Sequence, residues 1–387
     1  MFYVGIDVAK DKNDCVIMSS DGKIVVPNFS FSNNATEFEE LNQKISSCSL
    51  DPSCIKIGLE ATGHYSNHVV EYLANHQFQT FVVNPLHTCL YRKSLSFRKT
   101  KTDKVDAMLI TDLLRTETLL PYEPSSEEIQ QLKSLCRYRF TLVQDRSRLK
   151  VSTTRLINIL FPELEHFVSD LNGKSAHALM LEFPNAKEVA SCHLTHLTTL
   201  LSKASKGHHK KEDAILIRNA AITSVGSENP MQSLELQQTI QRIQLMDTQI
   251  KELERRIKLI MKRVPCQIMT IPGISYEFAA IILSEIGSFS NFSSPAKILA
   301  FAGLEPSIYQ SGQYTSTYAK MVKRGSKYLR FALVKAAESV CNWDPTFAEY
   351  LAQKLDQGKP YYVAISHVAK KLTRVIYCLE TKQIAYK

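Results

Sequence analysis

Residues 2–31 read FYVGIDVAKDKNDCVIMSSDGKIVVPNFSF and contain three short runs rich in β-branched and aromatic residues, at 2–9, 13–19 and 23–31. The turn signal Ser20-Asp21-Gly22 separates the second run from the third. The pattern predicts three strands in an antiparallel meander.

The chain after residue 31 alternates between helical and strand-like patterns. Helical spacing runs from Asn33 or Asn34 through Ile45 and again over 65–75, while CIKIGLE and FQTFVVN are strand-like. Three strands followed by alternating helices and strands predict an α/β domain with a mixed sheet.

Four acidic residues stand at the ends of these elements. Asp7 lies toward the end of the first strand and Glu60 just past CIKIGLE, while Asp103 and Asp106 open a predicted helix, TDKVDAMLITDLLR, with Thr102 as its N-cap. If the two strands are neighbours, their carboxylates meet at one edge of the sheet. Magnesium prefers hard oxygen ligands, and two such ions suit phosphodiester chemistry. Acids at a helix start also complement the helix dipole, which is the better interpretation of Asp103 alone but not of all four.

A basic stretch precedes that helix. Its cations are Arg92, Lys93, Arg98, Lys99, Lys101 and Lys104, and they surround Tyr91 and Phe97. Such side chains neutralise phosphates while aromatic rings stack on bases. A solvated loop is the usual alternative for a charge run, but the position beside the acids favours nucleic-acid binding.

The middle of the chain is predicted to be helical. Residues 127–160 and 236–264 carry apolar residues at steps of three and four, so the two helices are expected to pair as an antiparallel coiled coil or to join helices of another subunit. Residues 161–230 between them are predicted to form short helices and exposed loops. His208 and His209 could bind metal, but among neighbouring lysines a solvated basic turn is the better interpretation.

The last segment holds a second group of candidate residues. Pro272-Gly273 is predicted to form a turn before an apolar helix, and the glycine could let backbone amides approach a DNA phosphate or could serve an ordinary helix connection. Ser311, ahead of Gly312, could act as a nucleophile, although a plain turn and the hydroxyls of Tyr309, Tyr314 and Tyr318 are rivals. The following run of cations predicts a phosphate-binding surface: Lys320, Lys323, Arg324, Lys327, Arg330 and Lys335.

Composition bounds the class of protein. A length of 387 residues predicts two or three domains, and the net charge of +9 is modest but clustered. The nine cysteines lack zinc-ligand spacing and indicate buried thiols in a reducing compartment. No apolar run approaches the roughly 20 residues of a membrane helix, and we expect neither a leader peptide nor membrane association, hence a cytoplasmic protein.

Six motifs together resemble one family. In order they are GIDVAK, LEATGHY, KTDKVDA, IPGIS, FAGLEPSIYQSG and KRGSKYLRFAL, spread over roughly 1–115 and 265–340. This set is similar to the DEDD-type insertion-sequence transposases, RuvC-like serine recombinases that include the pilin-gene invertases and the bridge-RNA-guided transposases.

The resemblance implies a fold and a mechanism. It implies a RuvC-like (RNase H-like) mixed-sheet domain over 1–120, a helical coiled-coil domain over 121–264 with an added segment at about 161–230, and a helical serine transposase domain over 265–387. Asp7, Glu60, Asp103 and Asp106 would bind Mg²⁺ or Mn²⁺, and Ser311 would attack DNA to form a phosphoserine intermediate.

The implied partners are donor and target DNA, a structured guide RNA, and further copies of the chain as a homodimer assembling to a homotetramer, in the nucleoid of a bacterial cytoplasm. The added segment, longer than the family needs, would serve RNA or a partner. Rival functions are a hydrolytic RuvC-like nuclease, a DNA invertase without an RNA guide and a non-enzymatic nucleic-acid-binding protein. A sugar kinase or actin-like ATPase would need glycine-rich phosphate loops, which a chain with 13 glycines lacks.

Overall fold

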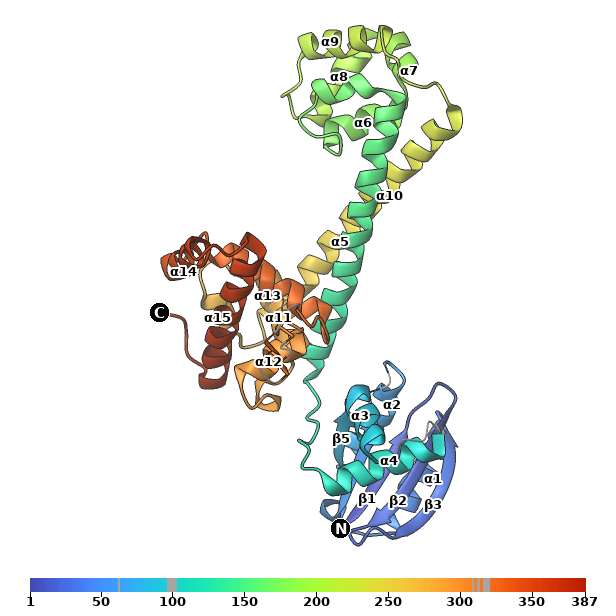
Figure 1. Ribbon diagram of the computed structural model, residues 1–387. Helices are drawn as coiled ribbons and strands as arrows, with labels where there is room; N and C mark the ends of the chain where they lie inside the picture. The colour runs from blue at the N-terminus through green and yellow to red at the C-terminus, as the bar shows by residue number, and fades with distance from the viewer. Residues whose placement is uncertain (62, 96–102, 308–309, 312–313, 316–320) are drawn as a thin grey trace. The chain divides into compact units, whose positions relative to one another are not determined.

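The computed structural model describes the chain apart from residues 62, 96–102, 308–309, 312–313 and 316–320, and apart from the side chains of residues 95, 103, 104, 310, 311, 314 and 315. The described chain divides into two compact units, Met1–Ser126 and Glu127–Lys387 (Figure 1).

The first unit is built on a five-stranded mixed sheet of order β3-β2-β1-β4-β5. β1 pairs antiparallel with β2 and β2 with β3, whereas β1–β4 and β4–β5 are parallel. The predicted meander and mixed sheet are therefore confirmed. The strands are β1 (Phe2–Asp7), β2 (Lys12–Ser19), β3 (Ile24–Ser32), β4 (Ile55–Glu60) and β5 (Gln79–Val83).

Helices cover both faces of this sheet (Figure 1). The helices are α1 (Ala35–Ser46), α2 (Ser66–Asn75), α3 (Pro85–Leu95) and α4 (Asp103–Thr116), with a short 3-10 helix at Pro52–Cys54. One face packs Val4, Ile6 and Ile57 against apolar residues of α1 and α2, and α4 lies on the other face. Because side chains alternate along a strand, residues of β1 on either side of Val4 and Ile6 point toward α4.

The second unit is centred on two long helices, α5 (Glu127–Leu160) and α10 (Pro230–Met261), which pack along each other. Ion pairs Arg139–Glu254 (2.6 Å) and Arg155–Glu235 (3.0 Å) show that the helices run antiparallel. α10 begins at Pro230, ahead of the predicted start at Leu236, because Asn229 caps it and proline suits the first helical turn.

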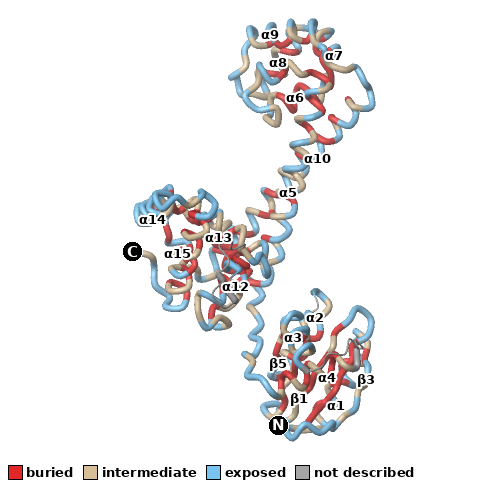
Figure 2. Tube along the Cα trace, viewed as in Figure 1, coloured by how far each residue is buried: buried red, intermediate tan, exposed pale blue. Residues whose placement is uncertain are grey.

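Residues 161–230 form a helical subdomain with a core of its own, shown in red in Figure 2. Leu179, Leu197 and Ile217 pack there against Leu160 of α5 and Leu236 of α10. The predicted short helices are confirmed as α6 (Lys174–Glu182), α7 (Ala186–Ser191), α8 (Leu194–Ala204) and α9 (Lys211–Ile222), with a 3-10 helix at Pro162–His166.

The C-terminal helices share one core with the near ends of α5 and α10, including Leu132 and Ile257. For this reason the second unit is continuous from Glu127, and a domain boundary at 264/265 stays a prediction. The elements are α11 (Tyr276–Ile286), α12 (Pro295–Ala302), β6 (Gln310–Ser311), β7 (Tyr314–Thr315), α13 (Lys327–Val340), α14 (Pro345–Asp356) and α15 (Tyr361–Lys382), with 3-10 helices at Ile268–Thr270 and Phe289–Asn291.

Two further expectations concern the whole chain. None of the helices in the described part of the chain is long and apolar enough to cross a bilayer. All nine cysteines are free thiols, but Cys89 is exposed and only Cys15, Cys136, Cys192 and Cys341 are buried, so the expectation of uniformly buried thiols was wrong.

Candidate active site

Asp7 and Glu60 end neighbouring parallel strands. The register pairs Ile6 with Leu59, so one more step along both strands brings Asp7 beside Glu60 at the carboxyl edge of the sheet. Both residues lie an even number of positions from glycines, Gly5 and Gly58, and therefore point to the α4 face. The predicted meeting of these two strands at one edge is confirmed.

Helix α4 lies close to the sheet because those two glycines have no side chains. Gly5 and Gly58 are partners in the register. A Cβ on Gly5 would stand 2.2 Å from Thr111 Oγ1, and one on Gly58 would stand 3.1 Å from Ile110 Cγ2. Near the other end of α4, Arg115 lies beside Gly22 in the β2–β3 turn, so the first turn of α4 lies toward Asp7 and Glu60.

Asp106, in that first turn, is buried and forms an ion pair with Arg92 of α3. Asp103 is the first residue of α4, as predicted, but its side chain lies outside the described residues, as does the predicted N-cap Thr102. The structure thus brings Asp7, Glu60 and the start of α4 to one edge of the sheet.

Helix α3 contacts two of the acids and was not recognised in the sequence. The buried Thr88 donates its hydroxyl to Glu60 Oε2 at 2.8 Å, and Arg92, one turn later, meets Asp106. The signal that could have found this helix is Asn84-Pro85, since Asn84 Oδ1 accepts the Leu86 amide at 2.9 Å and proline occupies the first turn.

Tyr91 joins α3 to α4 through its hydroxyl, and stacking of its ring on bases stays a prediction. Its hydroxyl donates to Asp112 Oδ2 at 2.8 Å, and burial, together with this hydrogen bond, raises the pKa of Tyr91. The hydroxyl therefore stays protonated and α3 is held against α4. Phe97 lies outside the described residues.

Asp14 is a second residue that sequence reasoning missed. It lies directly across from Asp7 in the β1–β2 pair and is buried. Asn28 and Ser30 of β3 donate to its Oδ1 at 3.0 and 2.9 Å, and Lys12 lies 3.6 Å from Oδ2. These bonds within the sheet already satisfy the Asp14 carboxylate, so it supports the edge that carries Asp7.

The donor set of the four acids suits a divalent ion that prefers oxygen ligands, such as Mg²⁺ or Mn²⁺. Within the residues that the structure describes, no group of three or more acidic, histidine or cysteine side chains is gathered closely enough to hold a metal ion. Of the four acids, Asp103 has a side chain outside the described residues, and Asp106 is in contact with Arg92. His208 and His209 likewise belong to no such group among the described residues.

Ser311 lies in a short hairpin of the second unit, where it pairs with Tyr314, but its side chain is not among those described. Tyr309, Tyr318 and Gly312 also lie outside the described residues. The base of this hairpin is fixed by backbone hydrogen bonds from Lys323 to Gly303 (3.1 Å) and from Ser326 to Phe301 (2.8 Å).

Two glycines allow that backbone contact. Gly303 and Gly325 both have left-handed φ values, +68° and +85°. A Cβ on Gly303 would stand 2.1 Å from the Arg324 carbonyl, and one on Gly325 would stand 2.0 Å from the Phe301 carbonyl. We call this arrangement the glycine clamp of 301–303 and 323–326.

An ion pair between the exposed Arg137 and the buried Glu285 carboxylate supports the same clamp. Arg137 of α5 binds Glu285 of α11 through two bonds, at 2.6 and 2.9 Å, and Ser326 donates to Glu285 Oε2 at 2.7 Å. Burial raises the pKa of Glu285, but the bonds from Arg137 and Ser326 outweigh it and hold that pKa below its ordinary value.

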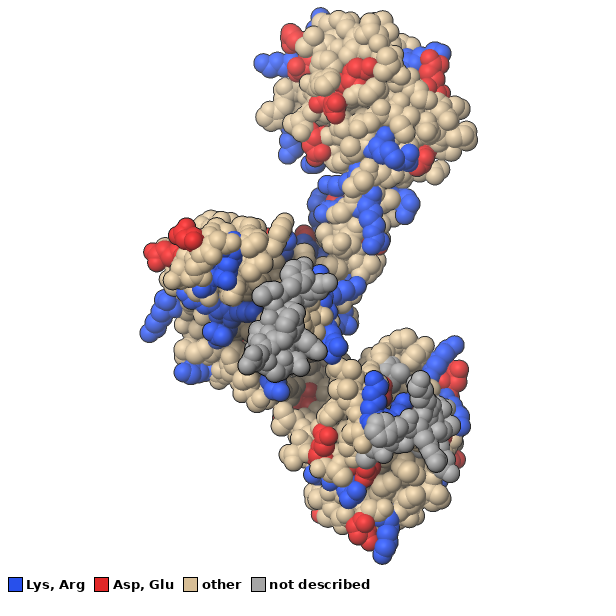
Figure 3. All heavy atoms as spheres, viewed as in Figure 1, with Lys and Arg blue, Asp and Glu red and all other residues tan. Residues whose placement is uncertain are grey.

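The predicted phosphate-binding cations differ in their exposure and in their hydrogen bonds. Lys323, Arg324 and Lys327 are exposed, as is Lys93 in the first unit. Arg330 donates to the Ala302 carbonyl at 2.8 Å and so also stabilises the end of α12. Arg98, Lys99, Lys101 and Lys320 lie outside the described residues. Figure 3 shows further Lys and Arg side chains along α5 and α10.

Packing within the second unit leaves no room for a side chain at Gly273. A Cβ there would stand 2.8 Å from Trp343 Cδ1, and Ser339 Oγ donates to the Gly273 carbonyl at 2.6 Å. The turn before α11, with φ +86° at Gly273, is as predicted. These contacts favour the helix-connection interpretation, and a DNA contact at Gly273 stays a prediction.

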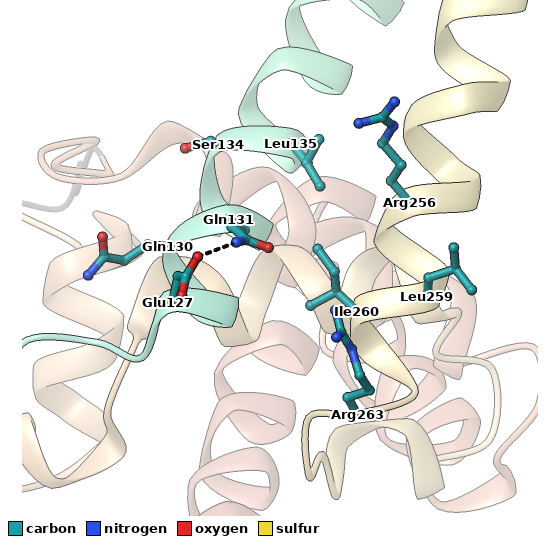
Figure 4. A pocket seen from close by; sticks show the side chains of 9 residues that line it. All are labelled: Glu127, Gln130, Gln131, Ser134, Leu135, Arg256, Leu259, Ile260 and Arg263. Atoms are coloured by element: carbon teal, nitrogen blue, oxygen red, sulfur yellow. Dashed lines mark hydrogen bonds between the residues drawn. The ribbon is translucent and has the colours of Figure 1, made fainter.

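An open groove of about 730 Å³ lies between the start of α5 and the end of α10 (Figure 4). It contains none of the predicted catalytic residues. Leu135, Leu259 and Ile260 give it an apolar floor, and Arg256 and Arg263 lie at its side. The groove is therefore a surface feature of the helix pair.

Two segments of the chain match models of transposase families, and the chain is similar to several known proteins over most of its length. Residues 4–162 match a family model for DEDD transposases of IS110 type, described as a transposase, and residues 266–352 match the model of the transposase IS116/IS110/IS902 family. The pilin gene-inverting protein of Moraxella bovis is 25% identical over 97% of this chain and 95% of its own length. A protein of insertion element IS116 from Streptomyces clavuligerus is 22% identical (97% and 94%), and the transposase of insertion sequence element IS1328 from Yersinia enterocolitica is 24% identical (89% and 87%).

Proposed function

Because the chain belongs to the IS110/IS116 family of DEDD transposases, and is thus an enzyme acting on DNA, we propose that it cuts and rejoins DNA through a phosphoserine intermediate at Ser311. The observation that carries the proposal is the strand register that brings Asp7 beside Glu60, with α4 and Asp106 over the same edge. A carboxylate edge of this kind suits phosphoryl transfer.

The acids form the metal half of the proposed site. Asp7, Glu60, Asp103 and Asp106 would hold Mg²⁺ or Mn²⁺, in a family that is usually metal-dependent. When bound, the ion supplies Lewis-acid stabilisation of charge on the phosphate oxygens. The chain's own residues orient this set: Thr88 fixes the Glu60 carboxylate, and the glycines under α4 fix the height of Asp106 above the sheet.

The serine forms the nucleophilic half. The Ser311 Oγ–P bond forms as the bond from phosphorus to the bridging oxygen of the leaving strand breaks, and the serine proton ends on that strand as a hydroxyl. The reverse reaction with the hydroxyl of another strand rejoins DNA, so no ATP is needed. Lys323, Arg324 and Lys327, exposed beside the glycine clamp, would bind phosphates near the hairpin.

Partners and outcome are part of the proposal. A structured guide RNA would choose donor and target DNA by base pairing, with the helical subdomain of 161–230 available for RNA or a partner protein. A homodimer assembling to a homotetramer would let one subunit's acids meet another's serine. The pilin gene-inverting relative favours DNA inversion as the second candidate, and the IS1328 transposase favours transposition. Inversion without an RNA guide remains the alternative proposal.

A covalent protein–DNA adduct tests the proposed role of Ser311 as nucleophile. Protein incubated with nicked element-end DNA and a transcript of the noncoding DNA flanking the gene should yield a protein–DNA adduct that maps to Ser311. Ser311→Ala should lose the adduct. An adduct that persists in Ser311→Ala would assign the nucleophile elsewhere.

A separate variant tests the acids. Asp106→Asn should lower strand cleavage roughly 10²–10³-fold or more while nucleic-acid binding is kept, because a metal ligand stabilises the transition state more than the bound substrate. Cleavage at the wild-type rate would show that Asp106 is not a ligand. Hydrolysis without an adduct, on the other hand, would favour the nuclease over the recombinase.

A further inference from the structure

The Arg92–Asp106 pair differs from the arginine pairs that use two nitrogens. Arg92 meets Asp106 through one terminal nitrogen, and its Nε is buried without a hydrogen-bond partner in the described part of the chain. Arg146 and Asp247 also pair through one terminal nitrogen, and in the described chain the Arg146 Nε is likewise buried without a partner. Arg137 binds Glu285 through two nitrogens and two oxygens, and Arg115 binds Asp112 through two nitrogens. A guanidinium that uses one donor and leaves another unsatisfied binds its partner less strongly than one held by two donors.

The position of the Arg92–Asp106 pair distinguishes it from Arg146–Asp247. α3 presents Thr88 and Arg92 one turn apart, and they contact Glu60 and Asp106, two acids of the proposed metal set. The Asp106 side chain is 8% exposed and that of Arg92 25%. A buried carboxylate requires a compensating cation, and in the described structure Arg92 supplies it.

Arginine cannot supply this charge and then lose it by titration, since a guanidinium stays protonated in proteins. A divalent ion that binds Asp106 therefore meets a positive charge that has to move away from it. Once moved, the guanidinium has several free donors beside the site where the proposed function places a DNA phosphate. Arginine suits phosphate because its donors match the phosphate oxygens.

We infer that Arg92 is a displaceable counter-ion, which holds Asp106 in the metal-free enzyme, yields it to the divalent ion and then binds the substrate phosphate. The inference rests on the proposed metal site. It makes metal and DNA binding mutually favourable, because each ligand takes one partner of the pair, and such coupling is reciprocal.

Metal affinity tests the first half of this inference. Mn²⁺ titrated into the full-length protein, followed by the electron paramagnetic resonance signal of free Mn²⁺, should bind about tenfold more tightly to Arg92→Gln than to the wild type, because the competing charge is gone. Arg92→Lys, which keeps a charge but not the fork of donors, should fall between them.

Arg115→Gln is the matched control. Arg115 also pairs with an aspartate of α4, and its side chain is 30% exposed, close to the value for Arg92, but Asp112 is not one of the four acids. Its Mn²⁺ affinity should equal that of the wild type. Far-UV circular dichroism confirms that each variant is folded, and Arg92→Lys keeps the test decisive if Arg92→Gln is not.

DNA affinity tests the second half. A fluorescent duplex oligonucleotide should bind Arg92→Gln roughly five- to tenfold more weakly than the wild type when Mn²⁺ is present, and equally when it is absent, because Asp106 then holds Arg92 in the wild type. A loss that does not depend on Mn²⁺ would make Arg92 an ordinary phosphate contact and overturn the displacement.

The possible failures are distinguishable. If the wild type binds no Mn²⁺, the proposed metal site is wrong and the inference fails with it. If the wild type binds Mn²⁺ and Arg92→Gln binds it equally or more weakly, the metal site stands, and Arg92 supports the Asp106 carboxylate from behind instead of competing with the ion.

Discussion

Two glycine pairs position the two halves of the candidate active site, and they do so for different reasons. Gly5 and Gly58 lie in ordinary extended strands, and their missing side chains let α4 lie close to the sheet. Gly303 and Gly325 have left-handed backbones and also meet carbonyl oxygens closely. The first pair controls the distance between two elements, and the second controls the path of the chain itself.

The acids of the first unit are held more completely than the hairpin of Ser311 in the second unit. In the first unit, Thr88 and the sheet register fix side chains of the acids, so the positions of Asp7 and Glu60 follow from the strands. In the second unit, the clamp fixes only the base of the hairpin that carries Ser311. The proposed role of the acids therefore rests on geometry, and the proposed role of Ser311 rests on the resemblance of its motif to the family.

The largest effect is expected from Gly5→Ala. The new Cβ would lie 2.3 Å from the Ala107 carbonyl as well as 2.2 Å from Thr111 Oγ1, and a helix packed on a sheet cannot shift locally to make room. We expect a loss of about 3–5 kcal/mol in the stability of the first unit. Hydrogen exchange of the β1 and β4 amides in the full-length protein measures it.

Gly63→Ala is the control for this first prediction. Gly63 has a left-handed φ of +59°, and no atom of the described residues lies within 4 Å of an added Cβ. It should cost about 1 kcal/mol from backbone strain alone. Equal losses in the two variants would show that the close approach of α4 does not depend on the glycine pair.

The second prediction concerns the clamp. Gly325→Ala combines left-handed strain with a collision at the Phe301 carbonyl, but a turn can move more easily than a helix, so we expect about 2–3 kcal/mol. The single tryptophan, Trp343, lies in the second unit and reports its unfolding in urea. Gly358→Ala, with φ +74° and no described atom within 4 Å of the added Cβ, should lose only about 1 kcal/mol.

The glycine pairs also show what the sequence can and cannot predict. The mixed sheet, the long helices and the position of the acids follow from local patterns of apolar residues and turns. The close approach of α4 does not, because Gly5 and Gly58 meet α4 only after folding. The contacts that Thr88 and Arg92 make from α3 do not follow either, since a hydrogen bond across 28 residues leaves no periodic signal, although Asn84-Pro85 does mark the start of the helix.

A third, smaller effect should come from the charge that supports the clamp. Glu285→Gln keeps the shape but removes the ion pair with Arg137, which should lower stability of the second unit by about 2 kcal/mol at pH 7, because Arg137 is partly exposed and can be hydrated. The pKa of Glu285 is depressed in the folded state, so its contribution is present above the unfolded value and is lost as the pH falls through the folded one.

The pH dependence separates this effect from simple packing. The difference between Glu285→Gln and the wild type should shrink once the pH falls below about 4.5, the ordinary pKa of glutamate, as the wild-type carboxyl becomes protonated. Urea unfolding followed at Trp343 across this range measures it. A difference that is constant with pH would mean that the pair contributes shape and not charge.

The smallest effect is expected from Thr88→Val, which removes only the hydroxyl that fixes Glu60. Loss of one buried hydrogen bond should lower stability of the first unit by about 1 kcal/mol, measured by hydrogen exchange of the β4 amides. The rate of strand cleavage should fall as well, because Glu60 is less well oriented.

The matched control is Thr153→Val on α5, where the buried hydroxyl has no hydrogen-bond partner in the described structure. There the same change should be neutral or slightly stabilising, since an unsatisfied polar group is removed. Equal losses at the two sites would mean that the Thr88 bond does not position Glu60, and that the sheet register alone fixes the acids.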